Sequence, residues 1–132
     1  MALRVYYEDT DAAGIVYYAN YLKFAERGRT EMMRGLGFDH SRVRAESGIV
    51  FTVRRCNVAY NGAARLDDAL TVETRVDKVA GATLSLRQLV RRAEEVLADL
   101  DVLVACVGEN GRPRRVPAEL RAALTAAATP GT

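Results

Sequence analysis

The sequence predicts an α+β protein in which an antiparallel sheet of about five strands wraps around one long helix. Between Tyr18 and Met33, apolar residues recur at three- and four-residue spacing, which is the period of an amphipathic helix. Between Ile49 and Cys106, the chain is rich in β-branched residues and in apolar–polar alternation, interrupted by short turns. Strands joined by short turns pair as antiparallel hairpins, and one amphipathic helix can cover one face of their sheet.

The elements follow a simple order along the chain. They are a strand over 3–7, an acidic loop over 8–14, the helix ending at Gly35 and Gly37, a polar connection over 39–47, strands over 49–60, 70–76, 83–93 and 96–106, and a short helix from Pro117 to about Leu124. Phe24, Met32 and Met33 are expected to fill the space between the long helix and the sheet. No second helix is left to cover the opposite sheet face, so association with another subunit is expected.

Length and composition limit the possible classes of function. The 132 residues make one domain, expected over 1–125, and the small residues of 126–132 are expected to form a flexible tail. Apolar residues make up 49% and charged residues 27%, which excludes disordered, collagen-like and disulfide-scaffold proteins. The net charge of +2 does not indicate nucleic acid or an anionic membrane as a partner.

The cysteines and the N-terminus indicate the cellular compartment. Cys56 and Cys106 lie in strand-like segments without metal-ligand spacing, so buried, reduced thiols are expected. No apolar run reaches the roughly 18 residues of a membrane span, and the first residues lead into a strand without the pattern of a signal peptide. A cytoplasmic protein is therefore expected.

Several kinds of chemistry have no counterpart in the sequence. His40 is the only histidine and lies in a polar segment, so a Ser-His-Asp triad would depend on this residue alone. No glycine-rich phosphate loop precedes a helix, and no His, Cys, Asp or Glu cluster has metal-ligand spacing. A site without cofactor or metal is expected.

The acidic loop is the candidate site. Asp9 and Asp11 lie just before the long helix, whose N-terminus offers unpaired backbone N–H groups and the positive end of the helix dipole. Such an end can hold a developing oxyanion, while a nearby carboxylate acts as nucleophile or general base. The alternative is structural, in which both residues only cap the helix and hold a turn.

At this loop the chain resembles the hot-dog-fold acyl-CoA thioesterases. The segment YYEDTDAAGIVYYANY over 6–21 is similar to the signature of the 4-hydroxybenzoyl-CoA thioesterase family and its YbgC-type, Tol-Pal-associated members. The segments RRCNVAY over 54–60 and ARLDDALTV over 64–72 are similar to strands of that family. The resemblance covers roughly 3–120 and implies a hot-dog fold, dimers or tetramers joined through their sheet edges, and active sites at the subunit interface.

The resemblance also implies roles for individual residues. Asp11 matches the catalytic carboxylate of the family, as nucleophile or general base, and Asp9 matches a residue that organises the loop. The backbone N–H of Tyr18, at the helix start, matches the group that polarises the thioester carbonyl. Many YbgC-type members have histidine at this position, whereas the hydroxybenzoyl-CoA branch has tyrosine. The implied reaction is hydrolysis of a short-chain or aromatic acyl-CoA to free acid and CoA.

Further residues are predicted to bind the acyl-CoA substrate. Candidates in and near the signature are Gly14, Val16, Tyr17, Asn20 and Tyr60. Lys78, Arg112, Arg114 and Arg115 are candidates for the CoA phosphates, because phosphate suits Arg and Lys; a solvated charged edge is the alternative. The tyrosines could equally pack in the core or an interface.

Two other functions remain open at this point. An acyl thioester dehydratase or hydratase would need a histidine paired with a carboxylate, and this would require His40 within hydrogen-bond reach of Asp11. A non-catalytic module would bind acyl-CoA or a protein without turnover.

Overall fold

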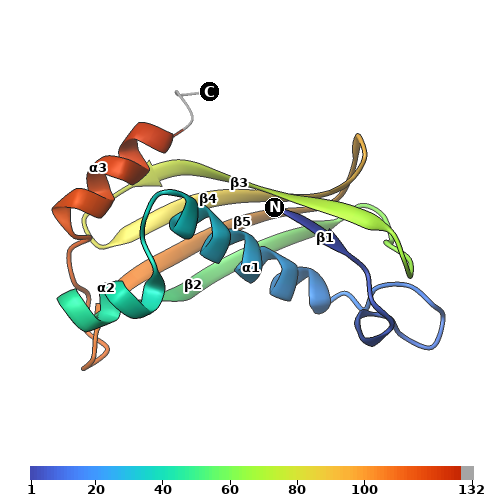
Figure 1. The fold of residues 1–132 in the computed structure, drawn as a ribbon, viewed down its shortest axis with the longest axis horizontal. Helices are drawn as coiled ribbons and strands as arrows, with labels where there is room; N and C mark the ends of the chain where they lie inside the picture. The colour runs from blue at the N-terminus through green and yellow to red at the C-terminus, as the bar shows by residue number, and fades with distance from the viewer. Residues whose placement is uncertain (129–132) are drawn as a thin grey trace.

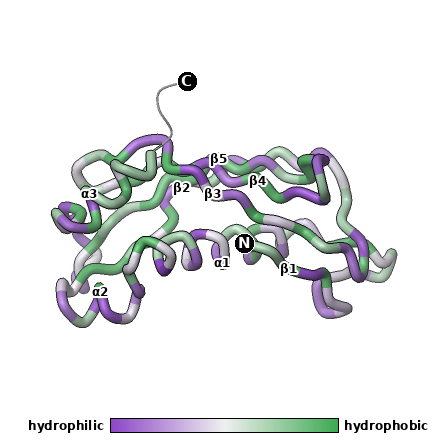
Figure 2. The backbone as a smooth tube through the Cα atoms, turned by 45° about the horizontal axis from the view of Figure 1, so that its top comes forward, coloured by the Kyte–Doolittle hydropathy of each residue, from purple (hydrophilic) through white to green (hydrophobic). Residues whose placement is uncertain are grey.

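The predicted fold class is confirmed by the computed structural model, which describes residues 1–128. The elements are β1 (Ala2–Arg4), a 3₁₀ turn (Tyr7–Asp9), α1 (Asn20–Gly35), α2 (His40–Ser47), β2 (Ile49–Tyr60), β3 (Ala69–Val79), β4 (Thr83–Arg92), β5 (Glu95–Gly108) and α3 (Ala118–Ala127). The strands form one five-stranded sheet in the order β1-β3-β4-β5-β2, with every neighbouring pair antiparallel. The sheet curls around α1 (Figure 1), so that sheet and helix form two layers (Figure 2).

The core lies between α1 and the concave face of the sheet. On the helix, Tyr21, Phe24 and Ala25 are buried, as the helical period predicts. Gly28 is a point of close approach, because a Cβ added there would lie 2.7 Å from Cγ1 of Val72. At this position the backbone of the helix therefore packs directly against the side chain of Val72 on the sheet.

A buried amide joins α1 to the sheet. Gln88, on β4, has no exposed surface, and its Nε2 donates to the backbone oxygen of Ala25 at 2.8 Å and to Oγ1 of Thr74 at 3.0 Å. Its Oε1 accepts a hydrogen bond from Nη1 of Arg29 at 3.0 Å. Because both polar atoms of this amide have hydrogen-bond partners, burying the side chain leaves neither of them unpaired.

Residues 40–47 are helical, so the prediction of a polar connection there is wrong. Asp39 caps α2, since its side chain accepts from the backbone N–H groups of Ser41 and Arg42. Gly48 ends the helix with a φ of 69°, in the left-handed region. Both capping signals are present in the sequence, but α2 buries only Val43 and so lacks the apolar period on which the prediction relied.

Other boundaries differ by a few residues. The first strand ends at Arg4, and α1 begins at Asn20, two residues after Tyr18. At the other end of the chain, α3 includes residues 126 and 127 of the predicted tail, and Ala128 forms an isolated bridge with Val76. The remainder of that tail, 129–132, lies outside the described residues.

The convex face of the sheet is charged rather than apolar. Glu73 pairs with Arg75 and Arg91 at 3.1 and 3.3 Å, and Asp99 pairs with Arg87 at 2.7 Å. These side chains alternate with the buried ones along their strands and therefore point away from α1. A face of this kind is stable in water, so it does not by itself require a second subunit.

Candidate functional site

The loop between β1 and α1 is held in place by Asp9. Its Oδ2 accepts a hydrogen bond from the backbone N–H of Tyr6 at 2.9 Å. Its backbone oxygen accepts from the N–H of Tyr17 at 3.0 Å and from Nδ2 of Asn20 at 2.8 Å. Asp9 thus ties the beginning of the loop to the beginning of α1.

Asp11 lies at the exposed tip of the same loop. Its Oδ1 accepts hydrogen bonds from the N–H groups of Ala13 at 2.8 Å and Ile15 at 3.4 Å. Gly14 closes the turn by donating to the backbone oxygen of Asp11 at 3.0 Å, with a φ of 78° that favours glycine. Within residues 1–128, no donor binds Oδ2 of Asp11, so this carboxylate oxygen is open to solvent or substrate.

The N-terminus of α1 has no side-chain cap. Ala19 is the N-cap residue and forms no capping bond, and the backbone oxygens of Tyr17 and Tyr18 accept from Asn20 and Tyr21 at 2.8 and 3.2 Å. In the described part of the chain, the N–H groups of Tyr18 and Ala19 have no acceptor. The structural alternative is that Asp9 and Asp11 cap the helix and hold a turn. Neither residue caps α1, and both hold the loop in place.

Tyrosine rings gather beside this helix end. The ring of Tyr18 lies 4.7 Å from that of Tyr17 and 6.0 Å from that of Tyr60, at the end of β2. Tyr21 lies beneath them, 5.7 Å from Tyr60, and its hydroxyl accepts from the N–H of Ala64 at 2.9 Å. Burial raises the pKa of Tyr60, and the exposed rings of Tyr17, Tyr18 and Tyr60 provide an aromatic surface.

Of the predicted site residues, the structure brings together those of the loop and Tyr60. Val16 and Asn20 are buried there, at 4% and 8% exposure, and hold the loop instead of facing solvent. Val16 donates to the backbone oxygen of Ala64 at 2.8 Å, and Asn20 donates to Asp9. Gly14 and Tyr17 remain exposed beside Asp11.

The basic residues predicted to bind CoA lie at the other end of the sheet. Lys78 is opposite Ser85, next to the β3–β4 turn, and Arg112, Arg114 and Arg115 follow β5, whose last residue is opposite Ile49. Ile49 and Tyr60 are the two ends of β2, about 35 Å apart for an extended strand. Within one chain, these basic residues are therefore remote from Asp11 (Figure 1).

His40 is likewise remote from Asp11 within the chain. It begins α2, and its ring lies 5.9 Å from that of Phe51, near the start of β2. The histidine–carboxylate pair that a dehydratase requires is not formed in this chain.

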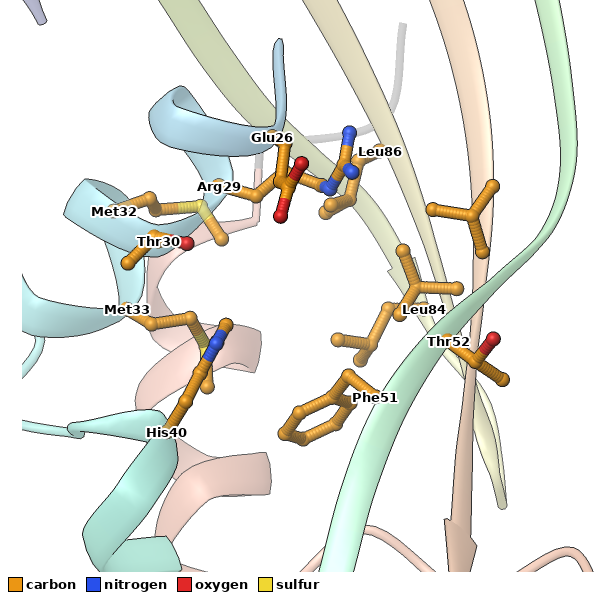
Figure 3. A pocket seen from close by; sticks show the side chains of 12 residues that line it. Glu26, Arg29, Thr30, Met32, Met33, His40, Phe51, Thr52, Leu84 and Leu86 are labelled. Atoms are coloured by element: carbon orange, nitrogen blue, oxygen red, sulfur yellow. The ribbon is translucent and has the colours of Figure 1, made fainter. Parts of the chain in front are cut away.

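A pocket that the sequence did not reveal lies between α1, α2 and the sheet. Its volume is about 330 Å³, and Figure 3 shows Met33 and His40 on one side and Phe51 and Leu84 on the other. Arg29 enters from α1. The pocket exists because α1 crosses β3 and β4 and leaves β2 partly uncovered, which depends on tertiary placement.

Residues 1–128 contain neither a cluster of metal ligands nor a helix that could span a membrane. No group of three or more His, Cys, Asp or Glu residues is placed to hold a metal ion. No helix in this range is long and apolar enough to cross a membrane.

Comparison with known proteins gives one consistent family. The family model described as thioesterase-like superfamily matches residues 5–124. The acyl-CoA thioesterase YbgC of Haemophilus influenzae is 45% identical over 123 residues, which are 92% of this chain and 90% of the relative. The acyl-CoA thioester hydrolase YbgC of Escherichia coli O6:H1 is 44% identical over 117 residues, 87% of each chain.

A solved structure supports the same assignment. A probable thioesterase from Bartonella henselae superposes with a TM-score of 0.85 at 37% identity, covering 89% of this chain and 97% of that one. The curled antiparallel sheet around α1 is the hot-dog arrangement that the resemblance implied. The chain belongs to the thioesterase-like superfamily.

Proposed function

We propose that the chain hydrolyses acyl-CoA thioesters at the loop before α1. The observation that carries this proposal is the uncapped N-terminus of α1, together with an aspartate in the preceding loop whose carboxylate keeps one oxygen without a donor within residues 1–128. An oxyanion donor and a nucleophile or base are the parts that acyl hydrolysis needs. The names of the YbgC relatives, acyl-CoA thioesterase and acyl-CoA thioester hydrolase, agree with this reaction.

The thioester carbonyl oxygen binds the N–H of Tyr18, where the helix dipole favours negative charge. Asp11 then attacks the carbonyl carbon through Oδ2, expels CoA as the thiolate and forms a mixed anhydride that water hydrolyses. Alternatively, Asp11 takes a proton from a water molecule that attacks the same carbon. One oxyanion donor lowers the barrier by about 3–4 kcal/mol.

The acyl group is short or aromatic in this proposal. The rings of Tyr17, Tyr18 and Tyr60 offer flat apolar surface beside the helix end. The pocket of about 330 Å³ along α1 has room for a compact acyl group.

A shared site in a homo-oligomer would explain where the basic residues lie. β2 is an edge strand, paired only with β5, and a second copy can pair with it antiparallel about a two-fold axis. Such pairing brings the Ile49 end of one β2 towards the Tyr60 end of the other. Lys78, Arg112, Arg114 and Arg115 of the partner then lie on the side of Asp11, at an interface site of a dimer or tetramer.

The test is thiol release from butyryl-, octanoyl- and 4-hydroxybenzoyl-CoA by wild type and Asp11→Asn. Asparagine keeps Oδ1 as an acceptor for the turn, so we expect a native fold and a loss of at least about 100-fold in kcat. Asp101→Asn, an exposed carboxylate on the convex face, is the matched control and should keep full activity. Acyl-CoA binding without any turnover would instead favour the non-catalytic module.

A further inference from the structure

Arg29 occupies an unusual position in the pocket between α1 and β2. Its guanidinium donates through Nη1 to Oε1 of Gln88 at 3.0 Å. Among residues 1–128, no carboxylate lies within 4.0 Å of it. Burial lowers the pKa of Arg29 while the charge of Glu26 raises it, and the side chain remains a cation.

The buried amide of Gln88 fixes this cation. Nε2 donates to two acceptors, the backbone oxygen of Ala25 and Oγ1 of Thr74, so Oε1 must be the atom that faces Arg29. Of the five N–H donors of a guanidinium, one is used by Gln88. The others have no acceptor within residues 1–128 and can bind a group in the pocket.

Most of the other residues that line the pocket are apolar, and the polar ones are Glu26, Thr30, His40 and Thr52. Met33, Phe51, Leu84 and Leu86 line it opposite or beside Arg29 (Figure 3). A plain hydrocarbon there would displace water from the guanidinium and return no hydrogen bond, which is costly for a charged group. A carboxylate would return charge and paired hydrogen bonds, because its two oxygens match the guanidinium fork.

The pocket and the proposed reaction site lie along the same two elements, α1 and β2. Arg29 lies nine residues after Asn20, where α1 begins, which is about 14 Å along the helix at about 1.5 Å per residue, and a helical side chain leans back towards the N-terminus. On β2, the ring of Tyr60 lies beside that of Tyr18 at the end of the strand, and Phe51 lines the pocket nearer its start. The same two elements therefore border both places.

We propose that Arg29 is a specificity-determining residue that selects acyl groups ending in a carboxylate, that is, CoA monothioesters of dicarboxylic acids. The proposal rests on the thioesterase function proposed above and specifies its substrate class. Arg29 binds the distal carboxylate, Gln88 positions Arg29, and the apolar wall receives the methylene chain.

Glu26 has an opposing effect. It lies one turn before Arg29 on α1, lines the same pocket and is exposed to solvent. Its negative charge reduces the attraction of the pocket for a carboxylate, although solvent weakens this repulsion. Removing the charge of Glu26 should therefore strengthen the preference, which a purely structural role of Arg29 would not explain.

The experiment compares kcat/KM for length-matched pairs: succinyl- with butyryl-CoA, adipyl- with hexanoyl-CoA, and suberyl- with octanoyl-CoA. We expect at least one carboxylated member to exceed its partner about tenfold or more in wild type. In Arg29→Gln this ratio should fall to about one, in Arg29→Lys it should be partly kept, and in Glu26→Gln it should rise. Arg27→Gln, an exposed arginine of α1 outside the pocket, should leave the ratio unchanged.

Each result decides between the possibilities. Equal rates within every pair in wild type would overturn the role of Arg29 even if Arg29→Gln cannot be purified, and the thioesterase function would stand. If the protein preferred 4-hydroxybenzoyl- over benzoyl-CoA but showed no preference for carboxylated acyl groups, Arg29 would recognise a hydroxyl instead of a carboxylate. That result would overturn the proposed substrate class. If the protein hydrolysed none of these thioesters, the result would instead count against the proposed thioesterase function itself.

Discussion

Gly28 of α1 lies directly over the amide of Gln88, so that a Cβ on Gly28 would be 3.1 Å from Nε2. Nothing larger than hydrogen fits between the helix and the sheet at this point, because Val72 is closer still, at 2.7 Å. This contact sets the height of α1 above the sheet and, one residue later, the position of Arg29. The helix is therefore placed by backbone contact as well as by apolar burial.

Gly28→Ala should destabilise the protein although alanine is the better helix former. The intrinsic gain is about 1 kcal/mol, but the clash with Val72 and Gln88 costs about 1–3 kcal/mol and should win. Urea unfolding measures the difference. Gly35→Ala is the matched control, because nothing lies within 4 Å of its added Cβ and the variant should be as stable as wild type or more so. Stabilisation by Gly28→Ala would contradict the close approach.

Tyr18→Pro should reduce kcat by about 100- to 1,000-fold, because proline removes the N–H proposed to bind the carbonyl oxygen. This N–H has no acceptor within residues 1–128, so its loss breaks no hydrogen bond of the described fold. Tyr18→Phe keeps the N–H and the ring, and we expect its kcat to stay within a few-fold of wild type. Single-turnover hydrolysis and a thermal unfolding curve for each variant make the comparison. Equal losses in both variants would assign the effect to the side chain.

Asp68 should stabilise the fold at neutral pH and lose this effect in acid. The N–H of Arg65 and the guanidinium of Arg92, each 2.8 Å from Oδ2, hold the pKa of Asp68 below its ordinary value. A carboxylate with a depressed folded-state pKa stabilises above its unfolded pKa of about 3.9, and the effect disappears as the pH falls through the folded-state value. Asp68→Asn should therefore have a lower urea midpoint than wild type at pH 7 and nearly the same midpoint at pH 2–3. A constant difference at both pH values would show that charge is not the cause.

Two inactive variants should restore activity together if the site is shared between subunits. Asp11→Asn lacks the carboxylate, and the double variant Arg112→Gln/Arg115→Gln lacks two of the basic residues proposed to bind CoA from the partner. Each homodimer has two defective sites, whereas a mixed dimer combines one intact Asp11 with one intact basic segment. Co-expressed chains with two different tags should regain up to about half of the wild-type activity per mixed dimer. No recovery in verified mixed dimers would place both sets of residues in one chain.

The sequence was sufficient for the fold class because its strongest signals were periodic. The helical spacing around Phe24 and the alternation along β3 to β5 both came from burial on one face, and burial is what holds these elements together. α2 escaped prediction because its capping residues, Asp39 and Gly48, act locally while its apolar face is almost absent. Local hydrogen bonds at its two ends stabilise this helix, although no apolar period in the sequence predicts it.

The candidate site was only partly accessible from sequence. The loop of Asp11 is continuous in the chain, so its residues could be recognised together. Arg29, Phe51 and Leu84 are far apart in sequence and line one pocket only because the sheet folds around α1, so this pocket could not be predicted. The positions of Val16 and Asn20 in the signature predict contact with substrate, and the structure adds that both are buried and support the loop from inside.

The free donor at the start of α1 belongs to the backbone, and this affects how the protein can diverge. Every amino acid except proline supplies the same N–H at position 18, so mutation can exchange the side chain there without deleting the donor. Descendants of one ancestor could in this way acquire different aromatic or polar surroundings for the acyl group by single substitutions. The substrate could then change within such a lineage while the backbone N–H at the start of the helix is kept.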